Sequence, residues 1–101
     1  MKIVAVIPVY NESATIADVV SSLKTIVQEI VVVDDCSTDD TGAKARAVGA
    51  HVIRNTVNSG YDGTLNNGFK EAASLGADVI VTCDGDGQHR PEDVRIVCGP
   101  I

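Results

Sequence analysis

Short apolar stretches recur along this chain and are separated by segments with a different rhythm. Four of them are rich in β-branched residues and almost continuously apolar, at positions 3–9, 29–33, 51–54 and 78–83. Runs of this length suit strands that are buried on both faces, which is the situation in a parallel sheet. The pattern therefore predicts four buried strands.

The segment after the first strand has the spacing of an amphipathic helix. Either Asn11 or Ser13 is expected to cap this helix, because a short polar side chain at the N-cap accepts a backbone N–H. The apolar positions recur at i, i+3, i+4 and i+7, as one stripe on a helix requires. They are Ile16, Val19, Val20 and Leu23.

Further helices are predicted after each later strand. The sequence STDD at 37–40 has the form of a capping box and would open an alanine-rich helix that stops at Gly49. Pro91 suits the first turn of a last helix. Between these two, a helix that stops at Gly76 would carry a stripe of Leu65, Gly68, Phe69 and Ala72.

Strands and helices thus alternate in the order β-α-β-α-β-α-β, followed by the start of another helix. Such alternation gives right-handed crossovers and a three-layer α/β/α sandwich with a mostly parallel sheet. Ligands of such sheets collect beyond the carboxyl ends of the strands. We call this edge the rim; its loops, at 10–13, 34–37, 55–63 and 84–89, hold most of the unusual polar residues.

Length and composition narrow the classes of protein. A chain of 101 residues with 45% hydrophobic residues can form one domain with its own core, and we assign residues 1–101 to a single domain. A net charge of -6 argues against binding to nucleic acid. Three widely spaced cysteines predict reduced thiols in a cytosolic protein. The printed sequence has no apolar run long enough to cross a membrane.

Two rim loops offer groups that suit a nucleotide. Tyr10 can lie flat against a planar base while Glu12 and Asn11 supply polar contacts, although a turn that caps the helix explains this segment better when it is taken alone. Asp35 is expected to accept an imide or amide N–H of uracil or guanine. For Asp34, capping of the following helix is an equally good explanation.

The third rim loop and the helix start after it are rich in glycine. Backbone N–H groups at a helix N-terminus attract anions, so the segment loosely resembles a phosphate-binding loop. It matches neither GxGxxG nor GxxxxGK[ST] and has no lysine. A loop followed by a close helix–sheet contact at Gly68 explains it nearly as well.

The fourth rim loop has two aspartates, Asp84 and Asp86, on either side of one glycine. In an extended segment such residues point the same way, so both carboxylates can reach one Mg²⁺ or Mn²⁺ ion. Gln88 and His89 are close enough in sequence to assist. An Asp-Gly hairpin turn is the alternative, and we disfavour it because no strand pattern follows Gly87.

Four segments together resemble the inverting glycosyltransferases of family 2, which have the GT-A fold. The resemblance covers nearly the whole chain and points to the branch of dolichyl-phosphate mannosyltransferases and polyprenyl-phosphate glucosyltransferases. It implies an enzyme that transfers a sugar from a UDP- or GDP-sugar, with polyprenyl or dolichyl phosphate as a candidate acceptor. The segments are VIPVYNE, VVVDDCSTDDT, NSGYDGTLNNGF and DVIVTCDGDGQH.

The resemblance also implies roles for individual residues. Asp35 would read the base, and Asp84 and Asp86 would form a DxD motif, with Asp86 on the metal that bridges the diphosphate and Asp84 nearer the ribose or sugar. Gln88 would complete the metal shell. The metal would offset the charge that builds on the departing diphosphate. The rest of the nucleotide pocket would be lined by Pro8, Tyr10 and Glu12.

The chain departs from the family in two ways. Tyr61 and Asp62 stand where relatives often have a basic residue and a glycine, so a cation near the diphosphate is missing. A family catalytic domain also continues well past Ile101 and carries the general base there, so we assign no catalytic residue. We expect a donor-binding half that is inactive alone, resides in the cytoplasm or peripherally at the membrane, and self-associates through an open sheet edge.

The alternative function is a non-catalytic module that binds a nucleotide sugar or only self-associates. A phosphoacceptor receiver domain is disfavoured, because its acid pair would follow the first strand and a lysine would end a later one. A sugar nucleotidyltransferase would need a glycine-rich loop with an arginine after the first strand, and VIPVYNES is not such a loop.

Overall fold

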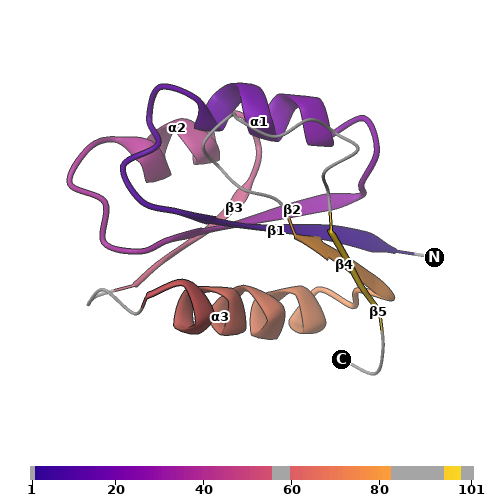
Figure 1. Ribbon diagram of the computed structural model, residues 1–101. Coiled ribbons are helices and arrows are strands. Elements are labelled where there is room, and N and C mark those ends of the chain that lie inside the picture. The colour runs from indigo at the N-terminus through magenta and orange to yellow at the C-terminus, as the bar shows by residue number, and fades with distance from the viewer. Residues whose placement is uncertain (1, 56–59, 83–94, 99–101) are drawn as a thin grey trace.

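The computed structural model describes residues 2–55, 60–82 and 95–98. Within these ranges five strands form one sheet in the order β3-β2-β1-β4-β5, and three helices pack on it (Figure 1). The elements are β1 Ile3–Val9, α1 Ile16–Leu23, β2 Glu29–Asp34, α2 Thr41–Ala47, β3 His51–Arg54, α3 Gly60–Ser74, β4 Val79–Thr82 and β5 Arg95–Cys98.

The predicted fold class is confirmed. β1 pairs in parallel with both β2 and β4, and β2 pairs in parallel with β3, so four neighbouring strands run in one direction. α1 and α2 cover one face of the sheet, and α3 covers the other (Figure 1). The protein is a three-layer α/β/α sandwich with a mostly parallel sheet.

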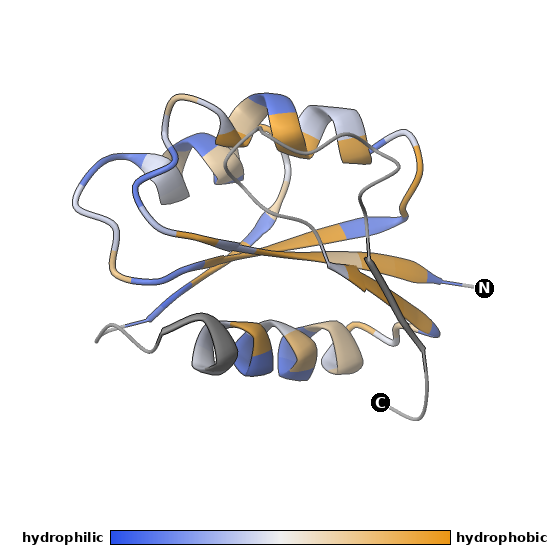
Figure 2. Ribbon diagram, in the orientation of Figure 1, coloured by the Kyte–Doolittle hydropathy of each residue, from blue (hydrophilic) through white to orange (hydrophobic). Residues whose placement is uncertain are grey.

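Side chains of the central strands alternate between two cores. On β1, Ala5, Ile7 and Val9 belong to the core under α1 and α2, whereas Val4 and Val6 belong to the core under α3. Figure 2 shows the result: β1, β2 and β4 are apolar over most of their length, while the helices are apolar mainly toward the sheet. Each valine or isoleucine among them, when fully buried, contributes about 1.5–3 kcal/mol.

α1 has the predicted apolar stripe but not the predicted cap. Its N-cap residue is Thr15, so the assignment of the N-cap to Asn11 or Ser13 was wrong. The side-chain carbonyl oxygen of Asn11 instead accepts the backbone N–H of Thr38, 2.8 Å away in another loop. All four stripe residues are buried: Ile16, Val19, Val20 and Leu23.

The capping box at 37–40 was also wrong. α2 begins at Thr41, and its N-cap residue is Asp40, which makes no side-chain capping bond. The Ser37 hydroxyl accepts the N–H of Asn11 at 2.8 Å instead of serving α2. Short polar side chains that resemble caps in the sequence therefore join one loop to another.

The predicted helix ends are confirmed. Gly49 and Gly76 each lie two residues beyond the last helical residue, with φ of 96° and 82°. This left-handed backbone conformation suits glycine and ends a helix. Of the helices in the described part of the chain, none is both long and apolar enough to cross a bilayer.

The end of the chain differs from the prediction. Pro91 lies outside the described residues, but Arg95–Cys98 form a strand and do not continue a helix. β5 pairs antiparallel with β4, so β4 is an inner strand and β5 is the edge strand on this side of the sheet. A β-branched segment beside an unpaired strand edge gains backbone hydrogen bonds by pairing with it.

The prediction that no strand follows Gly87 was wrong, because β5 does follow it. Residues 83–94 separate the two strands, however, and this connection is much longer than a two-residue Asp-Gly turn. A two-residue turn therefore does not join β4 directly to β5.

Candidate functional site

The rim predicted from the sequence exists in the structure. β1, β2 and β3 end side by side, because Val9 is paired with Asp34 and Asp34 with Arg54. β4 ends at Thr82 on the other side of β1. The loops after β1 and β2 leave this edge together and lie on the left in Figure 1.

Hydrogen bonds join the loop after β1 to the loop after β2. The backbone N–H of Asn11 donates to Ser37 Oγ at 2.8 Å, and the N–H of Thr38 donates to Asn11 Oδ1 at 2.8 Å. The N–H of Glu12 donates to Thr41 Oγ1 at 2.9 Å. Because bonds run in both directions, each loop fixes the backbone of the other.

Two rim residues other than glycine have left-handed backbone conformations. Asn11 has φ of 52° and Cys36 has φ of 67°. Asparagine tolerates this region, but for cysteine it is uncommon. The Cys36 thiol donates to the carbonyl oxygen of Asn55 at 3.3 Å. Strained residues of this kind cluster at functional sites, where surrounding contacts hold them in place.

Asp34 has a structural role at the rim. Its carboxylate is 1% exposed; Oδ1 accepts the N–H of Ser37 at 2.9 Å, and Oδ2 accepts Arg54 Nη1 at 3.0 Å. Arg54 Nη2 also donates to the carbonyl oxygen of Ser37 at 2.9 Å. Asp34 therefore holds the turn after β2, and it neither caps α2 nor reaches outward as a ligand.

Asp35 is held in a network of amides and hydroxyls. Its backbone N–H donates to the carbonyl oxygen of Val9 at 2.9 Å, which places it next to the loop after β1. Its Oδ1 accepts Asn55 Nδ2 at 2.9 Å. Asn55 Nδ2 also lies 3.4 Å from Thr64 Oγ1, and Asn55 Oδ1 accepts Asn67 Nδ2 at 2.8 Å. The network ties β2 and β3 to α3.

The sequence interpretation did not identify Asn55 or Asn67. Asn55 directly follows β3, and Asn67 lies in the middle of α3. The available signal was an asparagine that directly follows a predicted strand end at the rim. This signal is weak, because asparagine is common in loops for conformational reasons alone.

Three predicted nucleotide contacts lie beside this network. Tyr10 is 50% exposed and directly follows Val9, the residue that accepts the Asp35 N–H. Glu12 is half-buried in the same loop. Pro8 lies inside β1, opposite Val33. The structure thus brings Tyr10 and Asp35 together at the rim.

The predicted metal ligands cannot be placed in the same way. Asp84, Asp86 and Gln88 follow β4 in the sequence and lie outside the described residues. Within residues 2–55, 60–82 and 95–98, no group of three or more His, Cys, Asp or Glu side chains could hold a metal ion. A group of that size would therefore have to include residues outside these ranges.

Asp39 adds negative charge to the second rim loop. The Thr41 hydroxyl donates to this carboxylate and lowers its pKa below the ordinary value, and the backbone N–H of Thr41 also donates, at 3.0 Å. Asp39 is therefore ionised at neutral pH. An anionic ligand at the rim would meet a negative field unless a cation accompanied it.

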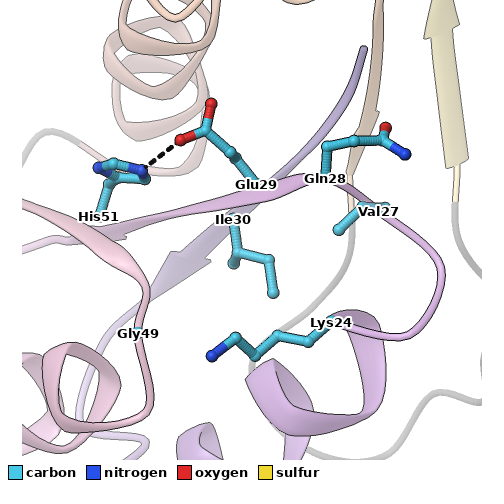
Figure 3. Close-up of a pocket in the computed structure, with 7 residues that line it drawn as sticks. All are labelled: Lys24, Val27, Gln28, Glu29, Ile30, Gly49 and His51. Atoms are coloured by element: carbon cyan, nitrogen blue, oxygen red, sulfur yellow. Dashed lines mark hydrogen bonds and ion pairs between the residues drawn. The ribbon is translucent and has the colours of Figure 1, made fainter. Parts of the chain in front are cut away.

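A pocket in the described part of the chain lies at the opposite end of the sheet, where β2 and β3 begin (Figure 3). Its volume of about 180 Å³ is below the range of ~300–1,000 Å³ typical of small-molecule sites. Glu29 and His51 in its wall already pair with each other at 2.8 Å. The pocket is lined by Lys24, Val27, Gln28, Glu29, Ile30, Gly49 and His51, and none of them is a predicted site residue.

Comparison with known proteins identifies relatives of the chain. Residues 4–101 match the sequence profile described as glycosyl transferase family 2. The undecaprenyl-phosphate mannosyltransferase of Micrococcus luteus is 37% identical over 101 residues, which cover 93% of this chain and 42% of the relative. The dolichol-phosphate mannosyltransferase of Pyrococcus furiosus is 40% identical over 100 residues, which cover 91% of this chain and 28% of the relative.

A solved structure shares the fold. Glucosyl-3-phosphoglycerate synthase from Mycobacterium tuberculosis, in complex with Mn²⁺, UDP and glucosyl-3-phosphoglycerate, superposes with a TM-score of 0.69 and 33% identity. The match covers 83% of this chain and 33% of that one. The same synthase has been crystallised with Mg²⁺ and UDP. This chain spans less than half the length of the curated relatives that it matches.

Proposed function

The chain belongs to glycosyl transferase family 2, and on that basis we propose that it supplies the nucleotide-sugar-binding part of a glycosyltransferase. The donor is a UDP- or GDP-sugar, and the acceptor is a polyprenyl or dolichyl phosphate. An acceptor oxygen forms the new bond to the anomeric carbon, and the nucleoside diphosphate leaves from the opposite face with the bonding electrons.

The observation that carries this proposal is the position of Asp35 beside Tyr10. Asp35 is 6% exposed and has a fixed backbone, so its carboxylate is held at the rim and not free in solvent. An ionised carboxylate only accepts hydrogen bonds, so it suits the N–H at position 3 of uracil or position 1 of guanine. The half-exposed ring of Tyr10 offers a flat surface for the same base.

The divalent cation belongs to the same proposal. Asp84 and Asp86, with Gln88, would hold Mg²⁺ or Mn²⁺ after β4, and carboxylate oxygens are the ligands that these ions prefer. Complexes of the similar synthase with UDP and either metal support this assignment. The ion would offset the charge that develops on the departing diphosphate.

Two relatives support the proposed acceptor. One is an undecaprenyl-phosphate mannosyltransferase and another a dolichol-phosphate mannosyltransferase. A lipid phosphate presents its oxygen at a membrane surface, so the proposed reaction takes place there. This assignment places the protein peripherally on the cytoplasmic side of a membrane.

Thermal unfolding with a panel of nucleotides tests the donor and metal sites. UDP or GDP should stabilise the protein in MnCl₂ and have no effect in EDTA, because the acidic rim repels a bare diphosphate. At a hundredfold excess over the dissociation constant the gain should be about 2.7 kcal/mol. Stabilisation of equal size in EDTA would show that the metal assignment is wrong.

Variants distinguish the two contacts. Asp86→Ala should abolish the effect of Mn²⁺, whereas Asp18→Asn, which removes an exposed charge from α1, should leave it unchanged. Asp35→Ala should weaken the binding of the preferred nucleotide, and that binding should still require the metal. An equal loss of affinity for every nucleotide would show that Asp35 has a structural role and does not contact the base.

A further inference from the structure

We propose that Asn55 is a positioning residue for base selection, whose side-chain amide sets the orientation of the Asp35 carboxylate. The proposal rests on the function proposed above, in which Asp35 reads the base. It concerns a residue that the sequence motifs do not include. Asn55 would not touch the nucleotide and would act only through Asp35.

The position of Asn55 is fixed by its own backbone. The residue directly follows β3, and its N–H donates to the carbonyl oxygen of Asp34 at 2.8 Å, which extends the pairing of β2 and β3. Its carbonyl oxygen accepts the Cys36 thiol at 3.3 Å. With 7% of its surface exposed, Asn55 is held between the loop after β2 and α3.

The orientation of the Asn55 amide follows from its partners. An ionised carboxylate has no proton to give, so the nitrogen side of the amide must face Asp35, at 2.9 Å. The oxygen side then faces Asn67 Nδ2, which donates to it at 2.8 Å. Asn67, Asn55 and Asp35 thus form a chain in which each amide donates toward the carboxylate. Such chains strengthen their own bonds by polarisation.

The hydrogen bond from Asn55 restricts the χ2 torsion of Asp35, which orients the carboxylate toward the base. The terminal χ2 torsion of aspartate is broad, so a carboxylate without a fixed partner can rotate. The bond from Asn55 to Oδ1 narrows the range of orientations open to the carboxylate plane. Hydrogen bonds need good alignment, so a restricted plane favours a base that offers an N–H at one position. Contacts to the diphosphate do not depend on this plane.

Two pairs of nucleotides measure this effect directly. Uracil has an N–H at ring position 3 where cytosine has a bare nitrogen, and guanine has an N–H at position 1 where adenine has a bare nitrogen. The bases of each pair also differ in their exocyclic groups, but those differences are the same for every variant. The change in the ratio of dissociation constants for CDP and UDP, or for ADP and GDP, between a variant and the unaltered protein therefore reports the carboxylate contact. We would measure it by titration calorimetry with the full chain in MnCl₂.

Asn55→Ala should lower the preference ratio about tenfold, as expected for the loss of a hydrogen bond to a charged group. The affinity for CDP or ADP should change by less than about twofold, since those bases do not use the contact. Gln28→Ala is the matched control, because Gln28 Oε1 accepts the N–H of Ile3 at 2.6 Å at the opposite end of the sheet. It should leave the ratio unchanged.

Each other outcome overturns something specific. Two results for Asn55→Ala would overturn the role of Asn55: an unchanged ratio of dissociation constants, or an equal loss of affinity for all four nucleotides. Neither result would contradict the proposed function. Failure of the unaltered protein to bind any nucleoside diphosphate overturns the proposed function and, with it, this proposal. If Asn55→Ala does not fold, Asn67→Ala should still lower the ratio by about threefold through loss of a neutral hydrogen bond. A ratio unchanged there also overturns the proposal.

Discussion

The two ends of the sheet are both polar, yet they are built from different side chains. At the rim the buried polar residues are short: Asp34, Asp35, Ser37, Thr41, Asn55 and Thr64. At the amino ends of the strands, Lys2 and His51 pair with Glu29 at 2.5 Å and 2.8 Å. Those three side chains remain 37%, 43% and 25% exposed.

The difference separates two uses of polar residues. Short buried side chains have few torsions and no water to replace a lost partner, so they hold one geometry. Exposed ion pairs are screened and mobile, and each typically contributes less than about 1 kcal/mol. The rim therefore has the fixed arrangement that ligand recognition requires, while the amino end only fastens elements to one another.

Lys2 illustrates the fastening role. Its backbone N–H donates to Asp78 Oδ2 at 2.7 Å, and its Nζ donates to the carbonyl oxygen of Leu75 at 2.5 Å. With the ion pair to Glu29, Lys2 connects β1 to β2, to the end of α3 and to the start of β4. α3 thus contacts the amino end through Leu75 and the rim network through Asn67.

The largest expected loss of stability comes from a substitution that pushes α3 away from the sheet. Such a change would disturb both ends of the sheet, because α3 is connected to each of them. A Cβ at Gly68 would overlap Val6 Cγ1 and lie 3.0 Å from Val33 Cγ2. Gly68→Val should therefore destabilise the protein by about 3 kcal/mol in urea unfolding, at the upper end for overpacking. Ser74→Val, on the exposed side of α3, is the control and should change the stability by less than about 0.5 kcal/mol. Equal effects of the two changes would mean that α3 does not pack closely at Gly68.

A smaller effect is expected from removing the buried carboxylate of the rim. Asp34→Ala should cost about 2 kcal/mol, because the N–H of Ser37 loses its partner while half-exposed Arg54 can return to water. Asp78→Ala removes the exposed acid that accepts the Lys2 N–H and should cost less than about 1 kcal/mol. If chemical denaturation ranks the two in the opposite order, the distinction between the ends fails.

The smallest effect concerns Glu29 and depends on pH. Hydrogen bonds from Lys2, and then from His51, hold the pKa of this carboxyl below its ordinary value of 4.5. A carboxyl with a lowered folded-state pKa stabilises the protein above its unfolded pKa, and this contribution disappears as the pH falls through the folded-state pKa. Glu29→Gln should therefore cost about 0.5 kcal/mol at pH 7 and nothing in strong acid.

Urea unfolding of both proteins between pH 7 and pH 3 checks this dependence. The two stability curves should converge on acidification. A stability difference as large at pH 3 as at pH 7 would show that the charge of Glu29 is not what stabilises the fold.

Much of the architecture was determined by local sequence patterns. The apolar runs predicted β1 to β4, and the spacing from Ile16 to Leu23 predicted α1, because burial on one or two faces imposes a period on the sequence itself. Gly68 was identified as a close contact for a similar reason, since only a residue without Cβ can lie against Val6. These features depend on neighbours along the chain and on the polarity of the interior.

The partners of the polar residues were decided only by the tertiary structure. Asn11 and Ser37 have the sequence character of helix caps, but their loops meet at the rim and they bond to each other's segment instead. Asn55 became the central residue of the rim because Asp35 and α3 reach it from distant parts of the chain. A short polar side chain forms whichever hydrogen bond lies within about 3 Å, and distances between loops are not encoded in any local period.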